Sequence, residues 1–69
     1  MEIKTLAEIK KGDLFYTLKE YEKYGDNEKY LRLKDEYDRS SKKWYCPRFT
    51  YDALGQGRYF KSDIKVVVI

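Results

Sequence analysis

Lys29-Tyr30-Leu31-Arg32-Leu33-Lys34 is the clearest sign of the fold class, because apolar and polar side chains alternate along it. In an extended chain the two leucines fall on one side and their neighbours on the other. A period of two with apolar residues on one face is typical of an antiparallel strand half covered by a core. We therefore expect Leu31 and Leu33 to be buried, and Arg32 and Lys34 to face solvent.

Four further segments predict strands, because β-branched and aromatic residues are frequent in them. They are Leu14–Leu18, Trp44–Tyr51, Arg58–Phe60 and Ile64–Ile69. Between them lie the turn residues Gly25-Asp26-Asn27, the polar stretch Asp35–Lys43, which is a loop or the projecting end of a hairpin, and the turn Asp52–Gly57.

The segment Trp44–Tyr51 departs from strict alternation around Pro47. Cys46 has one parity and Phe49 has the other. A β-bulge at the proline would place both side chains on the same side, and it would tolerate a residue without a backbone N–H. We therefore expect Cys46 to be a small buried hydrophobe and Phe49 to belong to the core.

The first eleven residues form a lead-in to the first strand. Thr5-Leu6-Ala7-Glu8 has the spacing of a capping box, which predicts a single helical turn. Gly12-Asp13 is expected to end this segment.

These elements predict an all-β fold, with residues 1–69 forming one domain. No helical stretch is long enough to connect parallel strands, so the five short strands are antiparallel. Closing them into a small barrel would cover the apolar face and remove the open edges. The expected core residues are Leu6, Ile9, Leu14, Leu18, Leu31, Leu33, Phe49, Phe60, Val66 and Val68.

Two short motifs carry a resemblance to known proteins. Ile9-Lys10-Lys11-Gly12-Asp13-Leu14-Phe15 resembles the opening of many SH3-like barrels, in which a Lys-Gly-Asp turn begins the first strand, and Lys61-Ser62-Asp63 resembles the link before their last strand. The resemblance implies a five-stranded SH3-like barrel. It implies no activity, because such barrels serve many unrelated functions.

A second resemblance lies in the middle of the chain. Glu36-Tyr37-Asp38-Arg39-Ser40-Ser41-Lys42-Lys43-Trp44-Tyr45-Cys46 is similar to a stretch found in small uncharacterised bacterial and phage-type proteins. This resemblance implies a bacterial or phage origin and carries no activity with it.

The composition argues against an enzyme. The chain has no histidine, so a Ser-His-Asp triad is impossible and most metal sites are excluded. Its single cysteine allows no intramolecular disulfide and has no histidine to activate it. The carboxylates of Asp35–Asp38 lack the spacing and the glycine of a calcium loop. We therefore expect no catalytic residue, no metal and no cofactor.

The sequence also indicates a cytoplasmic protein without a membrane partner. No segment approaches the roughly 20 apolar residues of a membrane span. Met1-Glu2-Ile3-Lys4 is not followed by the apolar run of a signal peptide.

The net charge of +3 is concentrated in the middle of the chain. Residues 1–28 hold five Lys against seven acidic residues, a balance of −2, whereas residues 29–61 hold nine Lys or Arg against four acidic residues, a balance of +5. Residues 39–48 contain four cations, two aromatic rings and no acid. Cations for phosphates and rings for bases are the groups that hold single-stranded nucleic acid. The predicted nucleic-acid-binding residues are Arg39, Lys42, Lys43, Trp44, Arg48 and Arg58.

Two other interpretations of this region stay open. The cations of a solvated hairpin also keep a small β-protein soluble and protect its edges, and Asp35, Glu36 and Asp38 would repel phosphates. Alternatively, the chain is a protein-interaction module. Some of its eight tyrosines must lie on the surface, where such rings favour binding interfaces, and an open strand edge offers a second means of recognition.

Overall fold

A computed structural model describes residues 2–49 and 57–69, and in these ranges the chain is mostly β with one short α-helix. The strands are β1 (Glu2–Thr5), β2 (Leu14–Thr17), β3 (Arg32–Leu33), β4 (Glu36–Asp38), β5 (Lys43–Cys46), β6 (Arg58–Lys61) and β7 (Lys65–Val68). The helix α1 spans Leu18–Tyr24, and two 3-10 turns, η1 and η2, span Leu6–Glu8 and Glu28–Tyr30. The all-β expectation is confirmed, but the described chain has seven strands instead of five.

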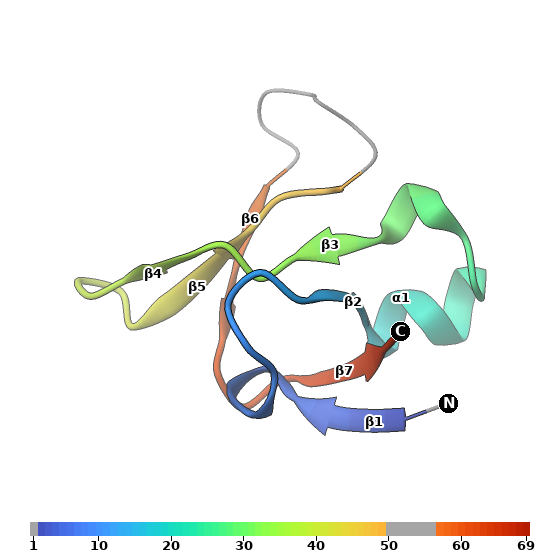
Figure 1. Ribbon diagram of the computed structural model, residues 1–69, viewed down its shortest axis with the longest axis horizontal. Helices are drawn as coiled ribbons and strands as arrows, with labels where there is room; N and C mark the ends of the chain where they lie inside the picture. Colours follow the sequence, from blue (N-terminus) through green and yellow to red (C-terminus); the bar gives the residue numbers. More distant parts are fainter. Residues whose placement is uncertain (1, 50–56) are drawn as a thin grey trace.

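The strands form two antiparallel sheets (Figure 1). The first sheet has the order β1-β7-β2-β3 and the second has the order β4-β5-β6. Residues 47–49 connect the two sheets, because Leu33 N donates to Pro47 O at 3.0 Å and Phe49 N donates to Leu31 O at 2.8 Å. The β4–β5 hairpin projects away from the first sheet (Figure 1), as one interpretation of Asp35–Lys43 expected.

The sheets do not close, so the prediction of a closed five-stranded barrel is wrong for the described chain. The corner between β6 and β7 shows the physical reason. Leu6 N donates to Ile64 O at 3.0 Å and Ala7 N donates to Ser62 O at 2.9 Å. These hydrogen bonds hold η1 against the turn between β6 and β7, and the two strands, which belong to different sheets and do not pair with each other, leave an open seam between them.

The N-terminal turn is confirmed as η1, preceded by a strand that the sequence did not predict. Thr5 N donates to Glu8 Oε1 at 2.8 Å, and the Thr5 hydroxyl donates to the same oxygen at 3.0 Å. These hydrogen bonds hold the pKa of Glu8 below its ordinary value. Glu2–Thr5 pairs with β7, so the expected lead-in is an edge strand of the first sheet.

Helix α1 was not predicted, and it begins at Leu18, the last residue of the expected strand Leu14–Leu18. The Thr17 side chain accepts from Glu20 N at 3.2 Å, and Gly25, with φ 70°, ends the helix. Thr17 and Glu20 have the spacing of a capping box, which is a local signal for a helix start. An apolar pair three positions apart, Leu18 and Tyr21, then packs on the first sheet.

The first sheet is covered on both faces. The inter-sheet core contains buried Leu6, Ile9, Phe15, Cys46 and Val66, and the helix-side core contains buried Tyr16, Leu31 and Val67 beneath α1 and η2. Neighbouring residues of β2 and β7 therefore enter different cores, which explains the uninterrupted valines of β7. Four of the expected core residues are buried and five are half-buried: Leu6, Ile9, Leu31 and Val66, then Leu14, Leu18, Leu33, Phe60 and Val68.

Phe49 is the expected core residue that the structure contradicts, because 56% of it is exposed. Cys46 is buried, Pro47 and Arg48 are half-buried, and Phe49 is exposed, so the chain does not bring Phe49 to the buried side of Cys46 as the expected bulge required. The remainder of the expected strand Trp44–Tyr51, and all of the expected turn Asp52–Gly57 except Gly57, lie outside the described residues.

Arg32 and Lys34 were expected to face solvent, but only 1% and 3% of them is exposed. The face of β3 opposite the helix-side core meets the second sheet instead of water. Arg32 Nη1 donates to Cys46 O at 3.0 Å, and its Nε lies 3.3 Å from Glu20 Oε1. Lys34 Nζ donates to Leu6 O at 2.8 Å and to Ile9 O at 2.6 Å.

In the part of the chain that the structure describes, no helix has the length and apolarity needed to cross a membrane.

Candidate nucleic-acid interface

The loop of the β4–β5 hairpin carries two of the six predicted site residues, Arg39 and Lys42, and both are exposed. Asp38 organises this loop: its carboxylate accepts from Ser40 N at 3.1 Å, from Ser40 Oγ at 3.0 Å and from Ser41 Oγ at 2.9 Å. These hydrogen bonds, first of all the one from Ser41, lower the pKa of Asp38. The acid that was expected to oppose phosphates therefore has a structural role in presenting the cations.

Lys43 and Trp44 follow the loop, but alternate residues of β5 point to opposite faces of the second sheet. Trp44 packs against the inter-sheet core. Its ring lies 4.3 Å from Lys34 Nζ, and its centroid lies 5.2 Å from that of Tyr37. Lys43 consequently lies on the other face. The structure separates this predicted cation from the predicted stacking ring.

Arg48 lies in an internal network beside the helix-side core. Its Nη2 lies 3.2 Å from Glu20 Oε2, and its Nη1 donates to Lys29 O at 3.0 Å. Its guanidinium also lies 4.9 Å from the centre of the Tyr30 ring. Because these contacts hold the guanidinium, Arg48 ties residues 47–49 to α1 and η2.

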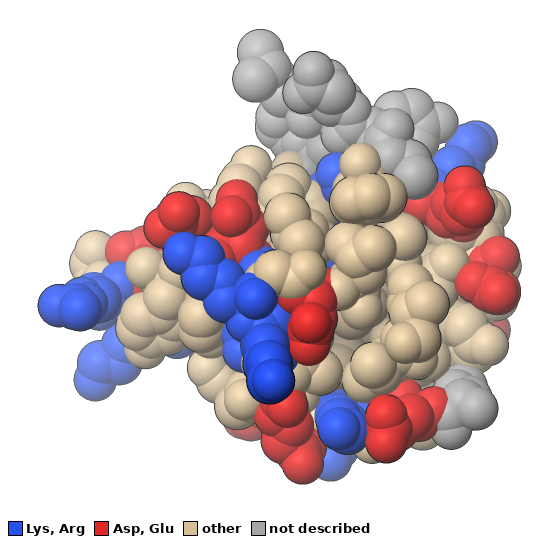
Figure 2. Space-filling model, in the orientation of Figure 1, with Lys and Arg blue, Asp and Glu red and all other residues tan. Residues whose placement is uncertain are grey.

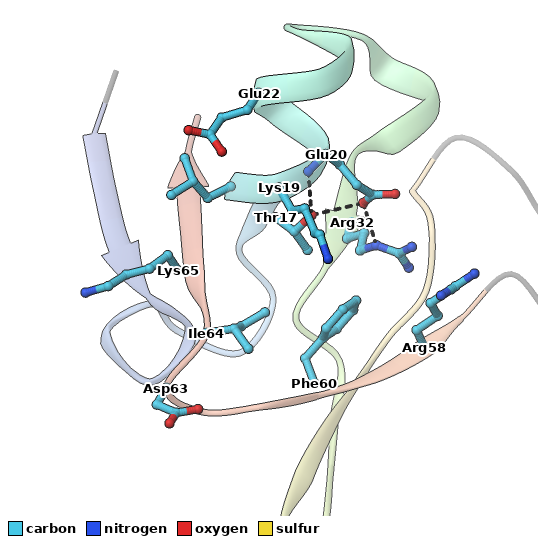
Figure 3. A pocket seen from close by; sticks show the side chains of 11 residues that line it. Thr17, Lys19, Glu20, Glu22, Arg32, Arg58, Phe60, Asp63, Ile64 and Lys65 are labelled. Atoms are coloured by element: carbon cyan, nitrogen blue, oxygen red, sulfur yellow. Dashed lines mark hydrogen bonds and ion pairs between the residues drawn. The ribbon is translucent and has the colours of Figure 1, made fainter.

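Arg58 is exposed and lies on β6 opposite Cys46, on the face that also carries Phe60. It lines a groove between α1, β6 and β7 (Figure 3). Arg58 is therefore on the opposite face of the second sheet from Lys43. Of the six predicted site residues, the structure brings together Arg39, Lys42 and Lys43, and it places Trp44, Arg48 and Arg58 elsewhere.

The face of the second sheet that points away from the inter-sheet core, here called the outer face, combines cations with rings. The pairing register places Lys43 opposite Lys61 and Tyr45 opposite Tyr59. The two tyrosine ring centroids are 5.3 Å apart at an interplanar angle of 53°, and 53% of Tyr59 is exposed. Among the described residues, neither lysine is engaged in an ion pair.

Sequence reasoning missed the outer face as a set, although a local signal for it exists. Lys43–Cys46 and Arg58–Lys61 each alternate between the two faces. Period-two analysis of both segments would have grouped Lys43 with Tyr45 and Tyr59 with Lys61. The sequence alone does not tell that the two pairs stand side by side, because that depends on the register between β5 and β6.

Gly57 lies against the Tyr45 ring. A Cβ atom built on Gly57 would overlap the ring atoms of Tyr45, so a larger residue at position 57 would require the Tyr45 side chain to move. The hydroxyl end of the Tyr45 ring therefore lies against the backbone at Gly57, just before β6.

In the pairing register of the described residues, the carboxylates beside the outer face belong to β4. β4 contributes Glu36 opposite Tyr45 and Asp38 opposite Lys43. Glu36 is paired with Lys11, at 3.9 Å between Oε1 and Nζ. Figure 2 shows Lys and Arg side chains at the projecting end of the hairpin with Asp and Glu side chains beside them. On the β6 side of the outer face, Tyr59 and Lys61 are paired with Tyr45 and Lys43, and neither is paired with a carboxylate.

Cys46 shows no sign of nucleophilic chemistry. Its side chain is fully buried, and burial raises the pKa of its thiol to about 11. Within residues 2–49 and 57–69, no group of three or more Cys, Asp or Glu side chains is arranged to hold a metal ion.

No family model matches the chain, and no curated protein and no solved structure is significantly similar to it.

Proposed function

We propose that the chain is a non-enzymatic module that binds single-stranded nucleic acid on the outer face of the second sheet. The observation that carries the proposal is the register of β5 and β6, in which a Lys43–Lys61 row lies next to a Tyr45–Tyr59 row. Flat rings accept bases of any sequence, and lysines beside them neutralise the phosphates between those bases.

The exposed hairpin loop extends this surface. Arg39 and Lys42 follow β4 and precede Lys43, so they continue the row of cations beyond the sheet. The carboxylates of Glu36 and Asp38 lie toward β4 and are engaged by Lys11 and by the loop serines. A single-stranded nucleic acid that runs along β5 and β6 contacts the tyrosine rings and the lysines. It stays away from the carboxylates of β4.

The flat shape of this surface favours single strands over duplexes. An open sheet face with rings gives bases a stacking platform, whereas base pairs of a duplex keep their faces covered. Among the described residues, the outer face carries no helix that could enter a major groove. Affinity is therefore expected to depend on charge and stacking more than on base sequence.

The proposal is tested by titrating the protein with labelled oligothymidylate and with a duplex, at two salt concentrations. Four cations on phosphates correspond to a slope of log K against log salt of roughly −3 for a single strand. Tyr59→Ala should weaken binding by about 1–3 kcal/mol, the amount typical of one stacked base.

A double variant, Lys43→Glu with Lys61→Glu, should abolish binding. Its matched control is Lys10→Glu with Lys29→Glu, which makes the same change in net charge at exposed positions away from the second sheet. Equal losses in both double variants would show that only net charge matters, and would refute the outer face as the site. Absence of binding by the unmodified protein at low salt would refute the function itself.

A further inference from the structure

The open seam between the sheets forms a groove that the nucleic-acid proposal does not use. The groove has a volume of about 790 Å³ and lies between the start of α1, β6 and the start of β7 (Figure 3). Apolar side chains and charges of both signs line it. They include Leu18, Phe60 and Ile64, the cations Lys19, Arg58 and Lys65, and the acids Glu22 and Asp63.

One wall of this groove is an edge strand. β6 pairs with β5 on one side, and none of the described residues pairs with its other side. An edge strand presents a row of backbone N–H and C=O groups that an extended peptide can pair with. The groove therefore has room for side chains beside an edge that offers main-chain hydrogen bonds.

Charge in the groove is divided between engaged and available groups. Glu20 at the groove wall lies 3.3 Å from Arg32 Nε and 3.2 Å from Arg48 Nη2, so its carboxylate is already bound. Lys19 points into the groove and Arg58 lies at its rim on β6 (Figure 3), and neither forms an ion pair with another described residue. Arg58 is the cation on the β6 edge itself, so a carboxylate on the ligand would complement the protein at that position.

We propose that the groove binds an extended peptide segment that adds to the free edge of β6 and places an acidic side chain at Arg58 and an apolar side chain at Phe60. Arg58 and Phe60 are two positions apart and face the groove together. Residues of an added strand alternate in the same way, so the acidic and apolar residues of the partner are also two positions apart.

A peptide suits this groove better than a nucleic-acid strand. Glu22 and Asp63 lie among its lining residues and would repel a ligand with a negative charge at every unit. A peptide carries its carboxylate at one position and leaves the others neutral. This inference is independent of nucleic-acid binding, because Arg58 and the outer-face lysines lie on opposite faces of the second sheet.

The test uses a capped peptide, Thr-Glu-Thr-Val-Thr-Glu-Thr, which offers the required spacing in either chain direction. Amide NMR of the labelled protein should show shifts in β6 and at the start of α1. A peptide of the same composition, Thr-Thr-Glu-Val-Glu-Thr-Thr, places the acid next to the apolar residue and should bind roughly tenfold more weakly.

Charge exchange tests the contact itself. Arg58→Glu should weaken binding of the first peptide roughly tenfold or more, whereas Lys61→Glu, on the same strand but on the outer face, should leave it unchanged. Replacing both Glu residues of the peptide by Lys should restore binding to the Arg58→Glu variant, which also shows that this variant is folded.

Three results would overturn the inference. The first is that millimolar peptide causes no shift in β6 or α1. The second is that oligothymidylate shifts the groove signals while the peptide does not, which would assign the groove to nucleic acid. The third is that β6 signals shift with protein concentration alone, which would make the β6 edge a contact between two copies of the chain.

Discussion

Lys34 joins three parts of the molecule through one ammonium group. Its Nζ donates to the carbonyl oxygens of Leu6 and Ile9 and lies over the Trp44 ring. Burial lowers the pKa of Lys34 below its ordinary value. Alternation along the strand correctly placed Lys34 opposite the leucines. It did not reveal what the second face meets, because that depends on a sheet formed by residues further along the chain.

Replacing Lys34 by methionine tests this role. Lys34→Met keeps an unbranched stem but removes the donor, so two buried carbonyl groups lose a hydrogen bond. We expect a loss of about 1–3 kcal/mol in the free energy of unfolding. Lys10→Met, at an exposed position, should change it by less than about 0.5 kcal/mol. If denaturant titrations gave the Lys34→Met variant and the unmodified protein the same free energy of unfolding, the Lys34 contacts would contribute nothing to stability.

Tyr16 makes the free energy of unfolding depend on pH in the alkaline range. Its hydroxyl donates to Asp26 Oδ1 at 2.7 Å, and burial, followed by this hydrogen bond, raises its pKa from 10.0 to about 12. The folded state keeps a proton that the unfolded state loses, so the contribution is complete below pH 10 and disappears as the pH approaches 12. Tyr16→Phe should therefore flatten the fall in stability between these values. If the free energy of unfolding fell equally steeply with pH in the unmodified protein and in the Tyr16→Phe variant, this assignment would be contradicted.

At the scale of elements, β3 and residues 47–49 show how burial is distributed where the two sheets meet. Leu31 lies in the helix-side core, whereas Phe49, whose backbone N–H bonds to Leu31 O, points to solvent. The alternation of Lys29–Lys34 correctly predicted the buried leucine. The expectation for Phe49 failed because it assumed that a bulge at Pro47 would bring Phe49 to the buried side of Cys46, whereas its side chain is exposed.

This difference gives a paired prediction. Leu31→Ala should lower the free energy of unfolding by about 2–5 kcal/mol, because it leaves a cavity beneath α1. Phe49→Ala should lower it by less than about 1 kcal/mol, because the ring is already exposed. Thermal or denaturant unfolding of the two variants checks both values. A larger loss for Phe49→Ala than for Leu31→Ala would contradict the orientation of both segments.

At the scale of the molecule, local patterns predicted the pieces and missed their arrangement. The antiparallel strands, the N-terminal turn and the projecting hairpin follow from residues close in sequence. The two covered faces of the first sheet and the open seam depend on contacts between distant segments, such as Leu6 with Ile64 and Lys34 with Ile9. For the same reason the sequence predicted the cations of the hairpin but not the tyrosine row beside them.

The most direct test of the central claim is an amide NMR titration of the labelled protein with oligothymidylate at low salt. Binding on the outer face predicts shifts concentrated at Lys43, Tyr45, Tyr59 and Lys61, with smaller shifts in the hairpin loop and none in α1. An unchanged spectrum, or shifts confined to α1 and the groove, would contradict it and leave the basic hairpin as solvated surface.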